Sequence, residues 1–147
     1  MTYRIENQLG KNFKDGFTIV ELMFVVAIIA VLMGVLAPNL NRYLQSSRKT
    51  SAKSAIRTLK GSVNLFNAHV GRYPTSLNEL IKKPTEERAA KKWEGPYLET
   101  KEVPSDPWGE RYVYKLTPQT EHPYELYSYG HNGRGAPKSE WISVWDE

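Results

Sequence analysis

The chain has 147 residues, the length of one modest domain, and a formal net charge of +4 at pH 7. Its cations are scattered and form no basic arm interleaved with aromatic residues, so the composition argues against nucleic-acid binding. Because the chain contains no cysteine, structural disulfides, thiolate catalysis and the usual zinc ribbons are excluded.

The first predicted element is a long apolar helix over residues 17–37, which follows a polar segment of residues 1–16. About twenty apolar residues are enough to span a bilayer. A cleaved secretory signal fits poorly, because its apolar run would be roughly 7–15 residues long and Pro38 would hinder cleavage after Ala37. An ordinary anchor fits poorly too, since a carboxylate such as Glu21 inside a membrane costs roughly 2–3 kcal/mol or more. A neutral Glu21 near the headgroups is the simplest explanation that remains open.

The residues around Glu21 point to a different kind of N-terminus. The stretch from Lys14 to Leu22 reads KDGFTIVEL, which closely resembles the prepilin-peptidase site of type IV pilins and pseudopilins. The resemblance implies cleavage between Gly16 and Phe17, N-methylation of Phe17, and a role in assembly for Glu21. The new ammonium on Phe17 would be neutralised by Glu21 of a neighbouring subunit, and such an ion pair in a low dielectric favours a fixed axial register.

An amphipathic helix is predicted next, over residues 38–71, with a kink at Pro38 because proline lacks the amide donor. Its apolar residues recur at steps of three and four, which predicts one buried stripe that packs on the C-terminal domain. Gly71 is well placed to follow the last helical residue, and Pro74 prevents continuation. The stripe consists of Leu40, Tyr43, Leu44, Ala52, Ala55, Ile56, Leu59, Val63, Phe66 and Val70.

A small domain over residues 72–147 completes the chain. Ser76 and Glu79 predict a capping box for a short helix, and a lysine-rich loop follows it. Strands are predicted over Arg111–Leu116 and Tyr124–Tyr129, with a third short strand within Trp141–Trp145. The predicted fold class is therefore α+β and pilin-like, with a long N-terminal helix packed on a small antiparallel sheet.

Three short motifs sharpen the resemblance. They are RYP at residues 72–74, GPYL at residues 95–98 and DPWG at residues 106–109. In this order after a pilin-like N-terminus, they resemble the major pseudopilin family of type II secretion, known as general secretion pathway protein G. The resemblance implies a structural subunit of a helical filament that drives protein export across the outer membrane.

The resemblance also implies the setting in which such a subunit works. Expected partners are further copies of the chain, prepilin peptidase, minor pseudopilins, the inner-membrane secretion platform and the membrane itself. The expected location is a single pass through the inner membrane with the C-terminal domain in the periplasm, although the positive-inside rule leans weakly the other way. Two alternatives stay open: a type IV pilin or competence pseudopilin, and a monomeric membrane-anchored binding module.

In that family a C-terminal loop binds calcium, and the corresponding stretch here is residues 128–142. It offers Asn132 and Glu140 as side-chain ligands. Calcium takes six to eight oxygens with enough negative charge, so one carboxylate, one amide and two nearby cations make a poor site. No cofactor is therefore required, and we expect a glycine-rich loop held by the packing of Trp141 and Trp145.

No residue pattern predicts catalysis. His69, His122 and His131 lack the spacing of a metal cage, and there is no nucleophile elbow or phosphate-binding glycine loop. Asp106 is predicted to form a turn. The sequence thus favours a structural protein over an enzyme.

Overall fold

The computed structural model describes residues 16–146, and for residues 35–39 it describes the backbone alone. It forms two units, one within residues 16–40 and the other over residues 41–146, and each is described by itself. The predicted leader, residues 1–16, lies outside the described residues except for Gly16.

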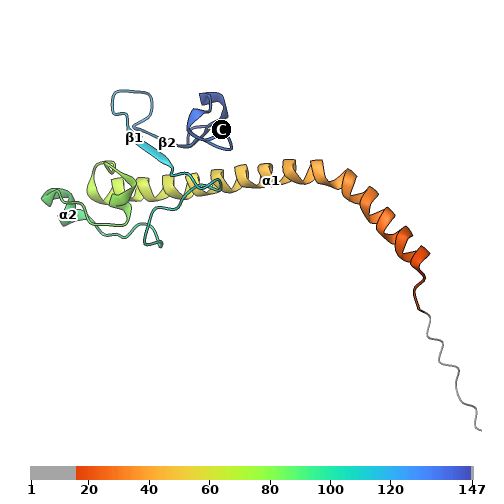
Figure 1. Ribbon diagram of the computed structural model, residues 1–147. Coiled ribbons are helices and arrows are strands. Elements are labelled where there is room, and N and C mark those ends of the chain that lie inside the picture. Colours follow the sequence, from red (N-terminus) through yellow and green to blue (C-terminus); the bar gives the residue numbers. More distant parts are fainter. Residues whose placement is uncertain (1–15, 147) are drawn as a thin grey trace, which may run out of the picture. The chain divides into compact units, whose positions relative to one another are not determined.

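Helix α1 (Ile19–Val70) is the longest element and belongs to both units (Figure 1). It ends where predicted, because Gly71 adopts a φ of 85° while its N–H still bonds the Asn67 carbonyl at 2.8 Å. The predicted kink at Pro38 falls at the junction of the two units, on residues whose side chains are not described, and it stays a prediction.

The predicted apolar stripe is confirmed in the second half of α1. Its buried members are Ala52, Ile56, Leu59, Val63, Phe66 and Val70. The prediction is wrong for Leu40, Tyr43 and Leu44, which are exposed. The physical reason is that the described part of the chain provides no element that covers this segment of the helix.

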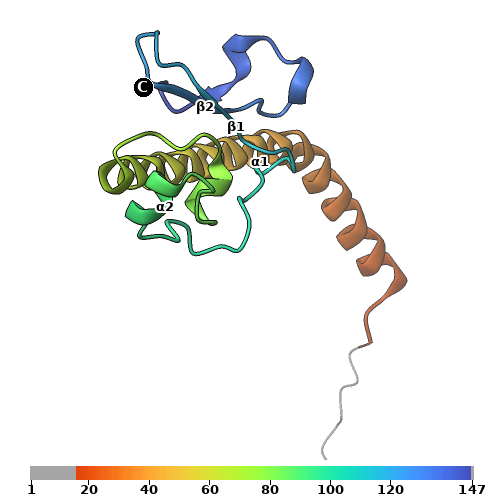
Figure 2. The ribbon, with the colours of Figure 1, turned by 90° about the vertical axis from the view of Figure 1, so that its left-hand side faces the viewer.

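The sheet has three antiparallel strands in the order β1 (Val113–Leu116), β2 (Tyr124–Ser128) and β3 (Ile142–Ser143). All three lie within the predicted ranges. Alternation sets the faces, since Tyr124, Leu126 and Ser128 are buried against the core while Glu125 is exposed. Figure 2 shows the sheet on one side of α1 and the segment that carries α2 on another side.

Two predictions about the connecting segment are wrong. The predicted lysine-rich loop contains a short helix, α2 (Glu87–Lys92). The expected helix after Ser76 is one 3-10 turn, η1 (Leu77–Leu80), and the Ser76 side chain makes no capping bond. The Glu79 carboxylate accepts a hydrogen bond from the Thr75 N–H at 2.9 Å and not from the Ser76 N–H that the predicted capping box would use. The Arg72 guanidinium donates to the same carboxylate and holds it near Thr75.

Candidate functional site

The predicted cleavage site lies just before α1. Gly16, Phe17 and Thr18 are not helical, and all three are exposed, with 87% of Phe17 accessible. A non-helical, exposed segment is a conformation in which a peptidase reaches a peptide bond. Cleavage and methylation themselves remain predictions.

Glu21 is held by Thr18 at the start of α1. The Glu21 carboxylate accepts hydrogen bonds from the Thr18 N–H at 2.9 Å and from its hydroxyl at 3.0 Å. In return the Glu21 N–H donates to the Thr18 hydroxyl at 3.2 Å. This reciprocal pair is a capping box, which our sequence reasoning missed although the T-x-x-E spacing signals it. It holds the Glu21 carboxylate at the N-terminus of α1, bonded to Thr18, the residue that directly follows Phe17.

The first unit presents an exposed apolar surface. The large apolar side chains described between Phe17 and Met33 are 46% to 87% exposed. No helix in the part of the chain with described side chains is both long and apolar enough to cross a membrane. An exposed apolar surface of this kind marks a segment that other molecules cover. Its members are Phe17, Ile19, Val20, Leu22, Met23, Phe24, Val25, Val26, Ile28, Ile29, Val31, Leu32 and Met33.

The two predicted calcium ligands do meet in the C-terminal loop. The Asn132 amide donates a hydrogen bond to the Glu140 carboxylate across a turn where Gly130 and Gly133 have positive φ. The pair supplies one carboxylate and one amide, far from the six to eight oxygens of a calcium site. No group of three or more His, Asp or Glu side chains suited to a metal occurs within residues 16–146. The donor set therefore does not fit calcium.

Trp141 closes this loop with contacts of its own. Its indole N–H donates to the Ala136 carbonyl at 2.9 Å, and its ring stacks on Tyr127 with centroids 4.3 Å apart. Trp145 contributes elsewhere than predicted, because its indole N–H bonds the Tyr124 carbonyl of β2 at 2.8 Å. The loop is thus held by Trp141 and not by Trp145.

Asp106 shapes the turn before β1, as predicted. One carboxylate oxygen accepts the backbone N–H groups of Trp108 at 3.0 Å and Glu110 at 2.9 Å. The other accepts the hydroxyl of buried Ser128, which in turn accepts the Gly130 N–H at 3.0 Å. This link to the C-terminal loop was missed, because a contact across 22 residues leaves no local pattern.

The three histidines lie apart from one another. His69 contacts the Tyr97 hydroxyl at 3.2 Å, His122 stacks on Trp145 at 4.1 Å, and His131 is exposed in the C-terminal loop.

Comparisons with known proteins agree with these features. The family model described as "Type II secretion system (T2SS), protein G" matches residues 39–145, and the "Prokaryotic N-terminal methylation motif" matches residues 11–37. The chain is 34% identical to the type II secretion system core protein G of Pseudomonas aeruginosa, over 94% of this chain and 99% of that one. It is 35% identical to the protein of that name from Escherichia coli K12, over 88% and 90% of the two chains.

A solved structure shares the fold. It is the major pseudopilin from the type 2 secretion system of enterohaemorrhagic Escherichia coli, with a TM-score of 0.59 and 24% identity. The match covers 74% of this chain and 95% of that chain. The predicted α+β, pilin-like fold class is thereby confirmed.

Proposed function

The chain belongs to the protein G family of the type II secretion system, and from this premise we propose that it is a structural subunit of the pseudopilus, the filament that drives protein export across the outer membrane. One observation carries the proposal. An N-terminal methylation motif over residues 11–37 runs directly into the protein G match over residues 39–145. Both halves of a pseudopilin are therefore present in one chain.

Processing comes first in this proposal. Prepilin peptidase cuts between Gly16 and Phe17, and the new Phe17 amine is N-methylated. The exposure and the non-helical backbone of both residues support cleavage at this bond. After the cut, the Phe17 ammonium and the Glu21 carboxylate lie at the same end of α1.

Assembly then depends on Glu21. In a single chain its carboxylate is satisfied by Thr18, whereas in a filament it neutralises the Phe17 ammonium of a neighbouring copy. The exposed apolar side chains from Phe17 to Met33 are covered by other copies once the helices pack together. The ion pair sets the axial register, because an unpaired charge among apolar helices is costly.

The proposed location and partners follow from family membership. The chain passes once through the inner membrane, with the domain over residues 72–147 in the periplasm. Its partners are further copies of itself, prepilin peptidase, minor pseudopilins and the inner-membrane secretion platform. It is not an enzyme, which agrees with relatives that are named core proteins of the secretion system.

Calcium has no part in this proposal. The C-terminal loop is stabilised by the Asn132–Glu140 hydrogen bond and by the Trp141 indole. These contacts hold the loop with side chains that the chain itself supplies.

The deciding experiment is intact-mass and N-terminal peptide analysis of the protein from native membranes. We expect a chain that begins at N-methylated Phe17. A chain that keeps its leader in a cell with active prepilin peptidase would refute the filament proposal in favour of a monomeric anchored module. A processed chain found in long surface filaments of cells without secretion genes would favour a type IV pilin.

A further inference from the structure

The C-terminal loop contains an asparagine that is directly followed by a glycine. The pair is Asn132 and Gly133, and no other asparagine of the chain precedes a glycine. Because glycine has no side chain, nothing shields its backbone nitrogen from the side-chain amide of the residue before it. Asn132 is exposed, so water also reaches this amide. The two residues therefore carry what is needed for the spontaneous deamidation of asparagine.

Deamidation needs no enzyme and no cofactor. The backbone nitrogen of Gly133 loses its proton to water and attacks the side-chain carbonyl carbon of Asn132. The bond from that carbon to the amide nitrogen breaks, the nitrogen takes up a proton and leaves as ammonia, and a cyclic succinimide remains. One water molecule then opens the ring at either carbonyl, which gives aspartate or isoaspartate. The net result is that a neutral amide is replaced by a carboxylate.

The folded loop holds the two reacting groups apart. The ring contains both the Gly133 nitrogen and the Cβ of Asn132, so these two atoms must lie on the same side of the bond that ψ describes. At the observed ψ of 0° the Gly133 nitrogen instead eclipses the backbone nitrogen of Asn132. Backbone bonds fix this turn, from the Gly133 N–H to the Gly130 carbonyl at 3.3 Å and from the Ala136 N–H to the Gly133 carbonyl at 3.0 Å. Attack therefore requires the loop to open.

Two side chains keep the loop closed. The Glu140 carboxylate accepts a hydrogen bond from the Asn132 amide, the group that would react. Trp141, the next residue, donates to the Ala136 carbonyl at 2.9 Å and stacks on Tyr127. Loss of either contact should raise the fraction of molecules in which the loop is open, and with it the rate of attack.

The products of the reaction do not fit the closed loop. An aspartate at position 132 places a second carboxylate against that of Glu140, and two like charges in contact repel each other. An isoaspartate adds a methylene group to the backbone of a turn that depends on positive φ at Gly130 and Gly133. Either product therefore favours the open loop.

We propose that Asn132 is a site of spontaneous deamidation, that Glu140 and Trp141 protect it by closing the loop, and that the reaction leaves the loop open once it has occurred. The reaction takes place within one chain. It therefore does not depend on filament assembly, and its outcome leaves the proposed function untouched.

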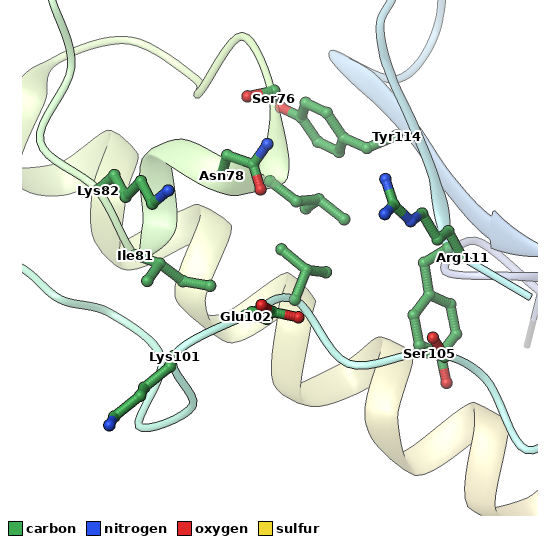
Figure 3. A pocket seen from close by; sticks show the side chains of 12 residues that line it. Ser76, Asn78, Ile81, Lys82, Lys101, Glu102, Ser105, Arg111 and Tyr114 are labelled. Atoms are coloured by element: carbon green, nitrogen blue, oxygen red, sulfur yellow. The ribbon is translucent and has the colours of Figure 1, made fainter. Parts of the chain in front are cut away.

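The test follows deamidation of the full chain in detergent micelles at neutral pH, by peptide mass spectrometry over time. Isotopically labelled water marks a carboxylate that forms during the incubation, so earlier deamidation is not counted. Asn78 is the internal control. It is exposed on η1 beside a cavity of about 500 Å³ (Figure 3), but Glu79 and not glycine follows it.

We expect labelled aspartate and isoaspartate at position 132 and none at position 78. Deamidation of Asn132 should be at least about tenfold slower in the folded chain than in denaturant. Glu140→Ala and Trp141→Ala should each speed it about fivefold, whereas Ser139→Ala should not change it. Glu140→Gln keeps the shape of the side chain with a neutral acceptor, so it should speed the reaction less than Glu140→Ala and guards against misfolding of that variant.

The consequence for the loop is tested with Asn132→Asp, which has the charge of one product. Near-ultraviolet circular dichroism should show loss of the signal from the stack of Trp141 on Tyr127. A wild-type spectrum would overturn the proposed opening of the loop. Equal rates in the folded and the unfolded chain, or unchanged rates in both Glu140→Ala and Trp141→Ala, would overturn the proposed protection. If no labelled product formed at position 132 in any sample, Asn132 would not be a deamidation site.

Discussion

Arg72 is the residue that ties the end of α1 to the domain that follows. Its guanidinium donates to the Glu79 carboxylate at 2.9 Å and to that of Glu86 at 3.1 Å, and it also donates to the Tyr73 carbonyl at 3.0 Å. Glu79 accepts from Thr75 as well. A half-buried cluster of charge-assisted bonds of this kind orients the chain where it leaves the helix.

Glu79 should make stability depend on pH. Burial alone would raise the pKa of its carboxyl, but the hydrogen bonds from Arg72 and Thr75 outweigh burial and lower the pKa below its ordinary value of 4.5. Because the folded-state pKa is depressed, the contribution is complete above about pH 4.5 and is lost as the pH falls through the folded pKa. Glu79→Gln should cost about 1–3 kcal/mol at pH 7, and the gap from wild type should shrink below pH 4.5.

Denaturant unfolding of the full chain in detergent micelles at pH 7 and in mild acid measures this. Glu87→Gln is the control, since its pair with Lys91 is exposed and should contribute less than about 1 kcal/mol. If the difference in unfolding free energy between wild type and Glu79→Gln did not change with pH, the charge of Glu79 would contribute nothing to stability.

At the scale of the element, the second half of α1 has two faces with different tasks. Leu59 is 1% exposed in the core beneath the sheet, whereas Leu65, on the same helix, is 48% exposed. The helical period separates the two positions, so the same residue type meets core on one face and solvent on the other.

Leu59→Ala should therefore destabilise the domain by about 2–5 kcal/mol, through lost burial and the cavity left behind. Leu65→Ala, the matched control, should change stability by no more than about 0.5 kcal/mol in the isolated chain. Thermal unfolding of both variants checks this. Equal losses would show that the two faces are packed alike.

The C-terminal loop should be insensitive to calcium. A ligand bound at a hundred times its Kd stabilises the folded state by about 2.7 kcal/mol, which raises Tm by several degrees. We expect the same Tm, within about 1 °C, in excess calcium and in chelator.

The Trp141 indole, rather than calcium, should stabilise the C-terminal loop. Trp141→Ala is expected to cost about 2–3 kcal/mol by removing the stack on Tyr127 and the bond to Ala136, while Ser139→Ala in the same loop is nearly neutral. A rise of several degrees in Tm on adding calcium would contradict the expected insensitivity of the loop to calcium.

At the scale of the whole molecule, the two units differ in the exposure of their apolar residues. The unit over residues 41–146 buries a core of apolar residues within itself, whereas the large apolar side chains described in the other unit are exposed. One chain thus combines a folded domain with an exposed apolar helical segment.

Glu21→Ala should leave cleavage and methylation intact but lower filament formation about tenfold or more, because the Phe17 ammonium then stays unpaired between packed helices. Electron microscopy and secretion of exoproteins measure assembly, and peptide mass measures processing. Thr18→Val is the control: it removes the hydroxyl bond to Glu21 but keeps the carboxylate, so filaments should still form. Wild-type filament levels in Glu21→Ala would show that another contact sets the register.

Local and periodic patterns predicted much of this protein from the sequence alone. The end of α1 at Gly71, the three strands and the turn at Asp106 each depend on residues within a few positions of one another. The methylation motif and the apolar run after it are likewise contiguous. Backbone sterics and helical or strand periods act over such short ranges, so the amino-acid order is enough to indicate them.

Only the tertiary structure decided which distant side chains meet. The Asp106–Ser128 bond and the Arg72–Glu86 pair each join segments that are separate in the sequence. Tertiary packing also decided that Tyr43 and Leu44 are exposed although their spacing continues the buried stripe. The period of a helix defines which residues share a face, but whether that face is buried depends on what the rest of the chain places over it.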